Sequence, residues 1–381
     1  MISDDRFLQV PWRVQEPQRL QKEDINHILQ WASQTDGISD IVLSSGNPAA
    51  ALRFGNVCFL MRRPLGDVEL LSLANEITGN GGSIIKSGQD YDFRHRVHKP
   101  DLKGYYFSRV NMTQSVMGPS ITFRLIPEVP PEFDEYGFEP ELRNHLFPRH
   151  GMVLMAGETG SGKTTALASI IRRRLTSESI NFISYESPPE YDFYQIPDRV
   201  ALVTQTDIPL DLPNYVAAVR NSLRRAPQLV LVGEARDHET ISGAVAEVRT
   251  GHALLSTVHT PSAHGTIDRM VSLFPPDEAR AAQVSLVDAL SVIIHQRLVA
   301  STDGRRVALR EWIVFTHDLK LDLIRLEPSE VGPFLQQHIN NPENRNCRSV
   351  TESARRLHVE GKISDLVLQE VMYSAGMAGK S

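Results

Sequence analysis

The sequence predicts an α/β fold with a mostly parallel sheet over residues 141–327, preceded by a smaller α+β domain over residues 21–126. After Gly151, short apolar segments alternate with helical segments, which is typical of strands buried on both faces of a parallel sheet. These segments are residues 152–156, 180–185, 229–232 and 253–256. Before residue 127, strand-like and helix-like segments mix, as in a small α+β domain.

The smaller domain has recognisable elements. Apolar residues recur at helical spacing over residues 22–32, so a helix is expected there, and residues 68–77 predict a second one. The expected strands are residues 40–43, 51–54, 57–61, 105–111 and 120–125. Residues 1–20 are polar and contain proline, and we expect an N-terminal arm.

Two further boundaries follow from composition. Residues 127–140 carry four prolines, which resist both helix and sheet, so we interpret them as the linker between the domains. From residue 328 to residue 381 the chain looks helical and charged, which predicts a C-terminal helical subdomain.

Charge and cysteine content argue against several classes of protein. A net charge of −6 argues against a protein held on nucleic acid by bulk charge. Cys58 and Cys347 are far apart, so neither a structural zinc site nor a disulfide framework is expected, and a reducing compartment fits. No apolar run approaches a membrane span and the start lacks a signal-peptide core, so any membrane role is expected to be peripheral.

A phosphate-binding motif follows the first strand of the larger domain. Residues 157–164 fit GxxxxGK[ST] between an apolar strand and a helix, a context that a chance match in a glycine-rich turn would lack. Lys163 would reach the β- and γ-phosphates of ATP, and the Thr164 hydroxyl would ligate Mg²⁺. The expected nucleotide-binding residues are Gly157, Glu158, Thr159, Gly160, Ser161, Gly162, Lys163, Thr164 and Thr165.

Carboxylates end two of the predicted strands. Glu234 follows residues 229–232, and we expect it to orient the attacking water or to help hold Mg²⁺. Glu186 and, after two prolines, Glu190 follow residues 180–185, and Glu190 is expected to support the same chemistry. The alternative is that these are ordinary solvated carboxylates.

Two histidines bracket the strand at residues 253–256. His252 fits a structural role as well as a functional one. His259 stands beside Thr257 and Thr260, and we expect it to sense the γ-phosphate. No third ligand stands at a suitable spacing for a metal site with these two histidines.

These motifs together resemble the secretion ATPases of the type II/type IV superfamily, which includes pilus-retraction and conjugative-transfer motors. The resemblance runs from about residue 39 to the C-terminal helices. It includes the phosphate loop, segments similar to the family's Asp, Walker B and His boxes, and a Gln296-Arg297-Leu298 signature. The three boxes are residues 185–191, 223–237 and 250–263.

The resemblance implies a hexameric ring with a PAS-like N-terminal domain and a RecA-like ATPase domain. It also implies that Arg109 and Arg124 approach the nucleotide phosphates when the domains close, as arginine fingers do. The alternative is that both make surface ion pairs of little energetic value. Further candidates, for a subunit interface, are Arg220, Arg224, Arg225 and Arg236.

Two positions depart from the family pattern. Ser187 stands where the Asp box has an acid, and Gln228 stands where an acid often precedes the Walker B strand. Their loss predicts at most a weakened Mg²⁺ site, because Glu186, Glu190 and Glu234 remain. The four-cysteine zinc insert of many type II secretion and pilus-assembly members is absent, and residues 233–241 look most like the Dot/Icm-type (IVB) and conjugative-plasmid branch.

The expected function is therefore Mg²⁺-dependent ATP hydrolysis by a homo-hexameric motor for type IV secretion. It would work in the cytoplasm, docked on inner-membrane secretion proteins, without binding nucleic acid directly. A pilus-retraction motor is the alternative within the family. A RecA-like DNA translocase and a non-hydrolysing scaffold are the alternatives outside it.

Overall fold

The computed structural model describes residues 6–12, 16–101, 104–126 and 129–378. These residues form two compact units. The first comprises Met1–Val129 together with Glu190–Gln195, and the second comprises Pro130–Pro189 and Ile196–Ser381. Within the described part of the chain, no helix is both long and apolar enough to span a membrane.

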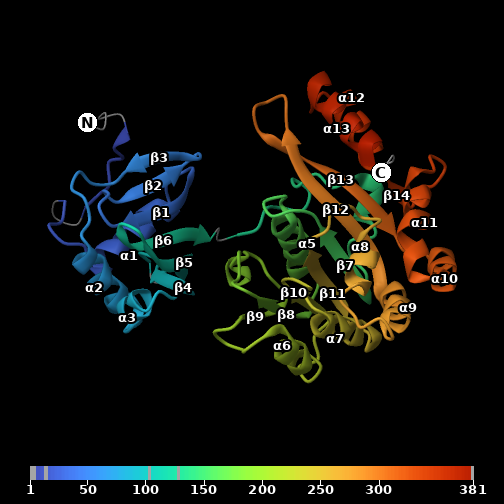
Figure 1. Cartoon of the computed structure of the whole chain (residues 1–381), viewed down its shortest axis with the longest axis horizontal. Helices are drawn as coiled ribbons and strands as arrows, with labels where there is room; N and C mark the ends of the chain where they lie inside the picture. Colours follow the sequence, from blue (N-terminus) through green and yellow to red (C-terminus); the bar gives the residue numbers. More distant parts are fainter. Residues whose placement is uncertain (1–5, 13–15, 102–103, 127–128, 379–381) are drawn as a thin grey trace. The chain divides into compact units, whose positions relative to one another are not determined.

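The first unit is an antiparallel sheet with helices on one face (Figure 1). Its strand order is β3-β2-β1-β6-β5-β4. The strands are β1 (Ile38–Ser44), β2 (Ala50–Arg53), β3 (Asn56–Phe59), β4 (Tyr91–His98), β5 (Tyr105–Ser115) and β6 (Gly118–Ile126). The helices are α1 (Lys22–Ser33), α2 (Asp67–Thr78) and α3 (Gly81–Lys86). Inward residues of β1, β5 and β6 alternate with outward ones, so the sheet has one covered and one open face.

Two parts of this unit differ from the sequence-based expectation. β4 and α3 were not expected. In β4, five charged or histidine side chains hide the alternation of the strand. One of them, His95, is buried and its Nε2 lies 3.0 Å from Asn26 Oδ1. The expected arm is also partly folded, since Leu8 and Trp12 pack on the core and Leu20 is fully buried. Residues 1–5 and 13–15 of that arm lie outside the described residues.

The second unit contains an eight-stranded sheet in the order β14-β13-β12-β7-β11-β10-β8-β9. All pairs from β12 to β9 are parallel, whereas β13 and β14 are antiparallel to their neighbours. This confirms the mixed α/β architecture that the sequence predicts. The strands are β7 (Gly151–Ala156), β8 (Asn181–Glu186), β9 (Leu202–Asp207), β10 (Leu229–Val232), β11 (Ala253–Val258), β12 (Leu290–Ala300), β13 (Arg306–Val314) and β14 (Cys347–Arg348).

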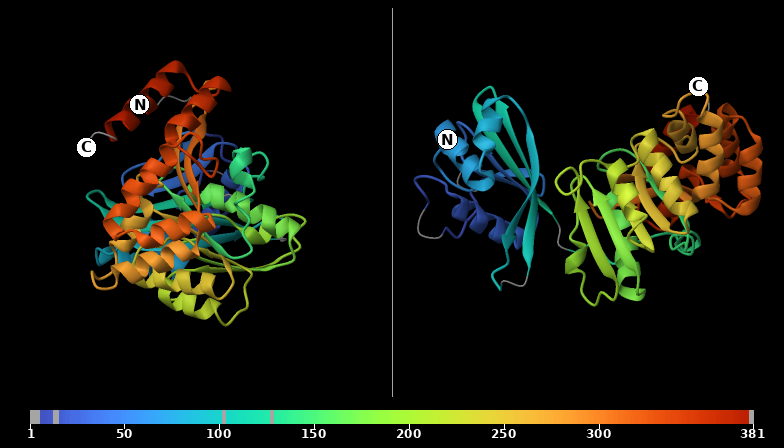
Figure 2. Two further views of the ribbon diagram at one scale, coloured as in Figure 1. Left: turned by 90° about the vertical axis from the view of Figure 1, so that its right-hand side faces the viewer. Right: turned by 90° about the horizontal axis from the view of Figure 1, so that it is seen from below.

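Helices cover both faces of the parallel strands (Figures 1 and 2). Met152 and Leu154 of β7 share a core with Ala244 of α7, and α5 contacts the same strand. The helices in this part of the unit are α4 (Pro140–Arg143), α5 (Lys163–Ser177), α6 (Tyr215–Ser222), α7 (His238–Arg249), α8 (Thr266–Val271) and α9 (Ala279–Ala289). Every residue of β7 is buried, as the apolar run before the phosphate loop indicates.

The C-terminal part is helical but also extends the sheet. It contains α10 (His317–Arg325), α11 (Pro328–Asn340), α12 (Val350–Val359) and α13 (Asp365–Ala378), and β14 pairs with β13. In Figure 1 the β12–β13 hairpin extends beyond the other strands, with α12 and α13 beside it. Leu309 of β13 is fully buried in a small core with Ala354 and Val371.

The proline-rich stretch differs from the expected linker. Residues 127 and 128 lie outside the described residues, but residues 130–140 belong to the second unit. Phe133 is only 5% exposed, and its ring centroid lies 5.1 Å from that of Phe138 and 4.9 Å from that of Phe147. The prolines prevent regular structure here, but the aromatic side chains between them still bury apolar surface.

Replacing Phe133 with alanine should lower the free energy of unfolding of the second unit by about 3–5 kcal/mol, because it removes a buried ring from a packed cluster. Urea denaturation measures this change. Phe54→Ala is the control, since Phe54 is 66% exposed and should cost less than about 1 kcal/mol. Equal stabilities of the Phe133→Ala and wild-type chains would show that residues 130–140 are a linker after all.

Candidate functional site

The phosphate loop, residues 157–164, joins the carboxyl end of β7 to the start of α5. Gly157, Gly160 and Gly162 have φ values of +141°, +79° and +83°, which side-chain-bearing residues rarely adopt. A Cβ at position 157 would also lie 2.4 Å from the carbonyl oxygen of Gln296. The glycine spacing of the motif is therefore required both by the backbone conformation and by close packing on β12.

Lys163 and Thr164 begin α5 at this loop. Lys163 is 7% exposed, and its Nζ donates to the carbonyl oxygens of Gly157 at 2.7 Å and Glu158 at 2.8 Å. Its ammonium group therefore lies over the loop, where a phosphate would bind. The Ser161 hydroxyl is buried and has no hydrogen-bond partner within the described part of the chain.

Glu234 and His259 meet at the same sheet edge, because β10 and β11 are parallel neighbours. The Glu234 Oε1 lies 3.7 Å from His259 Nε2, and the other carboxylate oxygen accepts from the Arg236 guanidinium at 2.7 Å. Thr257 fixes the backbone between them, since its hydroxyl donates to the carbonyl oxygen of Gly233 at 2.6 Å. The structure thus brings together two of the side chains that the sequence selected.

Glu186 is a second carboxylate at this edge, and it is buried. It ends β8, and its Oε1 accepts from the Ser184 hydroxyl at 2.6 Å and from Gln205 Nε2 at 3.3 Å. Burial raises the pKa of the neighbouring Tyr215, and the Glu186 and Glu234 carboxylates add to the rise. Sequence reasoning did not select Tyr215, since nothing in a lone tyrosine at the start of a helix marks it as part of a site.

Two residues of the motif region lie at the opposite edge of the sheet. His252 precedes β11, and its Nδ1 lies 2.9 Å from Glu247 Oε2, so it has the structural role that the sequence left open. Gln228 precedes β10, and its Oε1 accepts from the backbone N–H of Asn181 at 2.7 Å. The length of β10 therefore separates Gln228 from the phosphate edge of the sheet.

Arg109 and Arg124 lie in the first unit, directly opposite each other on β5 and β6. Arg94 of β4 stands opposite Arg109 in turn, so three guanidinium groups form one row across the open face. Like charges directly opposite one another destabilise a sheet unless acidic groups offset them. Asp40 pairs with Arg124 at 3.0 Å, Asp92 lies 3.9 Å from Arg109, and the charge of Arg94 opposes the burial that raises the pKa of Asp192.

Sequence reasoning missed Arg94, because the strand that carries it was not recognised. Glu190 is exposed and is grouped with the first unit, as are Arg109 and Arg124. The second unit by itself therefore assembles the phosphate loop, Glu234 and His259, and the remaining predicted site residues belong to the first unit.

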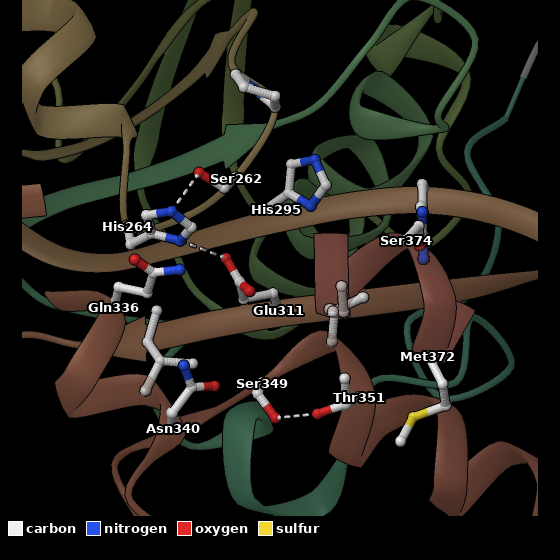
Figure 3. Close-up of a pocket in the computed structure, with 16 residues that line it drawn as sticks. Ser262, His264, His295, Glu311, Gln336, Asn340, Ser349, Thr351, Met372 and Ser374 are labelled. Carbon is white, nitrogen blue, oxygen red and sulfur yellow. Dashed lines mark hydrogen bonds and ion pairs between the residues drawn. The ribbon is translucent and has the colours of Figure 1, made fainter. Parts of the chain in front are cut away.

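A cavity of about 410 Å³ lies against the β12–β13 hairpin, lined by His295, Arg297 and Glu311 of these two strands (Figure 3). His264 Nδ1 lies 3.6 Å from Glu311 Oε1 there, and the Ala263 N–H donates to the same oxygen at 2.8 Å. Burial lowers the pKa of His295, which also lines the cavity, below its usual value. His295 pairs in register with Ala156, the last residue before the phosphate loop, but the cavity itself is separate from that loop.

The residues present fit a magnesium nucleotide. In the described part of the chain, no three His, Cys, Asp or Glu side chains gather as a metal site. Nucleotide-bound Mg²⁺ needs no such cage, since it takes one or two protein ligands and completes its shell with phosphate and water. Thr164 is half-buried at the start of α5. The buried Ser161 hydroxyl of the loop has no hydrogen-bond partner among the described residues, which fits a loop that binds an anion.

Comparison with known proteins identifies the family. Residues 89–374 match the family described as type II/IV secretion system protein. The type IV pilus retraction ATPase PilT of Pseudomonas aeruginosa is 31% identical over 303 residues, which cover 79% of this chain and 85% of PilT.

Solved structures agree with this assignment. The ATPase DotB of Legionella pneumophila superposes with a TM-score of 0.80 at 33% identity, covering 97% of this chain and all of DotB. The pilus retraction motor PilT, solved with bound ADP, superposes with a TM-score of 0.78 at 27% identity, covering 93% of this chain and 97% of PilT. The chain therefore belongs to the type II/IV secretion system protein family, alongside ATPases such as DotB and PilT.

Proposed function

We propose that this chain is a Mg²⁺-dependent ATPase that forms a homo-hexameric ring and energises a type IV secretion system. The observation that carries the proposal is the phosphate loop with Lys163 over it, facing Glu234 and His259 on the next strands of the sheet. Support comes from relatives, since DotB is an ATPase and PilT was solved with ADP.

Each residue of the site has a separate task in this proposal. The loop N–H groups and Lys163 bind the phosphates, and Thr164 with Glu234 holds Mg²⁺, which would neutralise charge on the phosphate oxygens. Glu234 accepts a proton or hydrogen bond from the attacking water, and His259, 3.7 Å away, senses the γ-phosphate. Because Arg236 donates to one Glu234 oxygen, we expect the other oxygen to accept from the attacking water.

The remaining residues belong to the first unit and would complete the site. Arg109 and Arg124 would stabilise charge on the transferred phosphoryl group when the ring closes, and Glu190 would support Glu234. The PAS-like description of the first unit and the docking of the ring on inner-membrane secretion proteins from the cytoplasm remain part of this proposal.

The test is steady-state ATP hydrolysis by the purified full chain, with and without Mg²⁺, together with its mass with and without nucleotide. We expect Mg²⁺-dependent turnover and a species of six chains. A motor of the DNA-translocating kind would be clearly stimulated by single- or double-stranded DNA, whereas we expect no stimulation. A chain that binds ATP but releases no phosphate under any of these conditions would be a scaffold instead.

Pilus retraction is the second candidate, and the similarity to PilT over 79% of this chain favours it. The likeness to DotB, which covers all of that chain, and the type IVB-like residues 233–241 favour secretion. The neighbouring genes separate these candidates, because we expect a conjugation or Dot/Icm-type cluster and a retraction motor would lie among pilus genes.

A further inference from the structure

Three side chains outside the motif, Tyr136, Gln296 and Arg310, form a hydrogen-bonded cluster that contacts carbonyl groups of the phosphate loop. Gln296 of β12 is fully buried, and its Nε2 donates to the carbonyl oxygen of Ser161 at 2.8 Å. The Tyr136 hydroxyl donates to the carbonyl oxygen of Gly162 at 3.1 Å and accepts from Gln296 Nε2 at 3.1 Å. Two consecutive carbonyl groups of the loop are thus engaged by side chains from distant parts of the second unit, and the Gly162 carbonyl also accepts from the Ala166 N–H of α5 at 3.0 Å.

Arg310 sets the orientation of Gln296. It stands opposite Gln296 on β13, is 2% exposed, and donates from Nε to Gln296 Oε1 at 2.8 Å. Because this bond occupies the amide oxygen, the amide nitrogen must face the loop. Arg310 also donates to the carbonyl oxygen of Gly137 at 2.9 Å and to Glu139 Oε2 at 3.2 Å, and its guanidinium lies 4.6 Å from the Phe138 ring centroid.

The hydrogen bonds to the Ser161 and Gly162 carbonyl groups also fix the direction of the N–H groups in the same peptide units. A trans peptide is planar, so its C=O and N–H point in opposite directions. When the Ser161 and Gly162 carbonyl groups are held outward, the N–H groups of Gly162 and Lys163 are held inward, toward the position of a bound phosphate. We propose that Gln296, Arg310 and Tyr136, the loop brace, are positioning residues that set the phosphate affinity of this loop, an inference that rests on the proposed function.

The loop brace also ties the loop to residues 136–139, which lie near the start of the second unit at Pro130. A displacement of this segment would therefore shift the Ser161 and Gly162 carbonyl groups through Tyr136 and Gln296. The same N–H groups contact phosphate in the ground state and in the transition state, so the brace should govern binding more than the chemical step.

Gln296→Glu is the variant that tests the brace. It keeps the oxygen that accepts from Arg310 but removes the Nε2 donor to the Ser161 carbonyl and the Tyr136 hydroxyl. We expect the Kd of MgADP, measured by calorimetry on the full chain, to rise about tenfold or more, since a buried carbonyl loses its partner. In steady-state assays KM for ATP should rise while kcat changes by less than about threefold.

The chain offers a matched control in Gln283 of α9. This side chain is also fully buried, accepts from Arg280 at 3.0 Å, and donates to the carbonyl oxygens of Leu323 and Leu326 at 2.9 and 3.0 Å. Gln283→Glu should cost similar stability, yet leave the affinity of the folded protein for MgADP unchanged.

A second variant covers the case in which Gln296→Glu does not fold. Tyr136→Phe keeps the ring and removes one hydrogen bond to the loop, and we expect about a fivefold weaker affinity for MgADP. Wild-type affinity in Tyr136→Phe and Gln296→Glu, or equal weakening in Gln283→Glu, overturns the brace. A wild-type chain that binds no MgADP overturns the proposed function as well, so the two failures are distinguishable.

Discussion

Replacing Glu234 with glutamine should lower kcat for ATP hydrolysis by about 10²–10⁴-fold, the range that a positioned general base contributes. The amide keeps the shape of the side chain and its bond to Arg236, but it has no basic oxygen for the attacking water. Because Lys163 and the loop amides are unchanged, the Kd for a non-hydrolysable ATP analogue should stay within about threefold of the wild-type value.

The control for this experiment is Glu239→Gln, five residues along the chain. Glu239 is exposed in the first turn of α7 and takes no part in the site. The Glu239→Gln variant loses the same negative charge as Glu234→Gln, but away from the site. Its kcat should therefore equal the wild-type value. Wild-type turnover in Glu234→Gln would remove the catalytic assignment of Glu234 and shift attention to the buried Glu186 at the end of β8.

Replacing Arg109 with alanine should lower kcat by about 10³-fold or more, the lower end of what an arginine finger contributes. Within the first unit the Arg109 side chain makes little stabilising contact that the substitution would remove. Its acidic neighbour Asp92 is 3.9 Å away, and 46% of the Arg109 side chain is exposed. A fall in kcat without a fall in stability would therefore indicate a role at the phosphates and not in the sheet. Arg124→Ala should act alike, but it also leaves the buried Asp40 without its cation, so its stability must be measured alongside.

Arg325→Ala is the matched control, because Arg325 also makes only a long surface ion pair, 4.0 Å from Asp322. Such pairs contribute little, so kcat and stability should both stay at wild-type values. Unchanged kcat in both Arg109→Ala and Arg124→Ala would leave the arginine row without a catalytic role. Arg94→Ala shows whether the row acts as three residues, since Arg94 pairs in register with Arg109.

The sequence predicted the centre of the second unit because one strand, one loop and one helix carry strong and independent signals there. β7 is a fully apolar run, and the glycines of the loop stand at positions where φ is positive. Glu234 and His259 were each selected from the sequence, and they lie close together because parallel strands end at one edge of the sheet.

The β12–β13 hairpin could not be predicted in the same way. It is part of the core, yet it carries Gln296, Arg310 and Glu311 in buried positions. Polar side chains at buried positions contradict the usual alternation, and only their mutual bonds explain why they are tolerated. The Gln296-Arg297-Leu298 signature was visible in the sequence, but its contact with the phosphate loop depends on the pairing of β12 with β7.

Sequence reasoning missed Arg94 and the burial of residues 130–140 for related reasons. The row depends on the register of three strands, one of which the sequence did not reveal. In the proline-rich stretch, the prolines dominated the interpretation, although Phe133 and Phe138 between them are buried. Aromatic residues inside a proline-rich segment are therefore a signal for a packed strap and not for a free linker.

The central claim is that the loop at residues 157–164 binds the phosphates of ATP through Lys163. Titration of the full chain with a non-hydrolysable ATP analogue and Mg²⁺ tests it most directly, with Lys163→Ala alongside. We expect saturable binding of about one nucleotide per chain or fewer in a ring, and a loss of at least about tenfold in affinity when the ammonium group is removed. Equal affinity in the two proteins, or no binding by a folded wild-type chain, would contradict the claim.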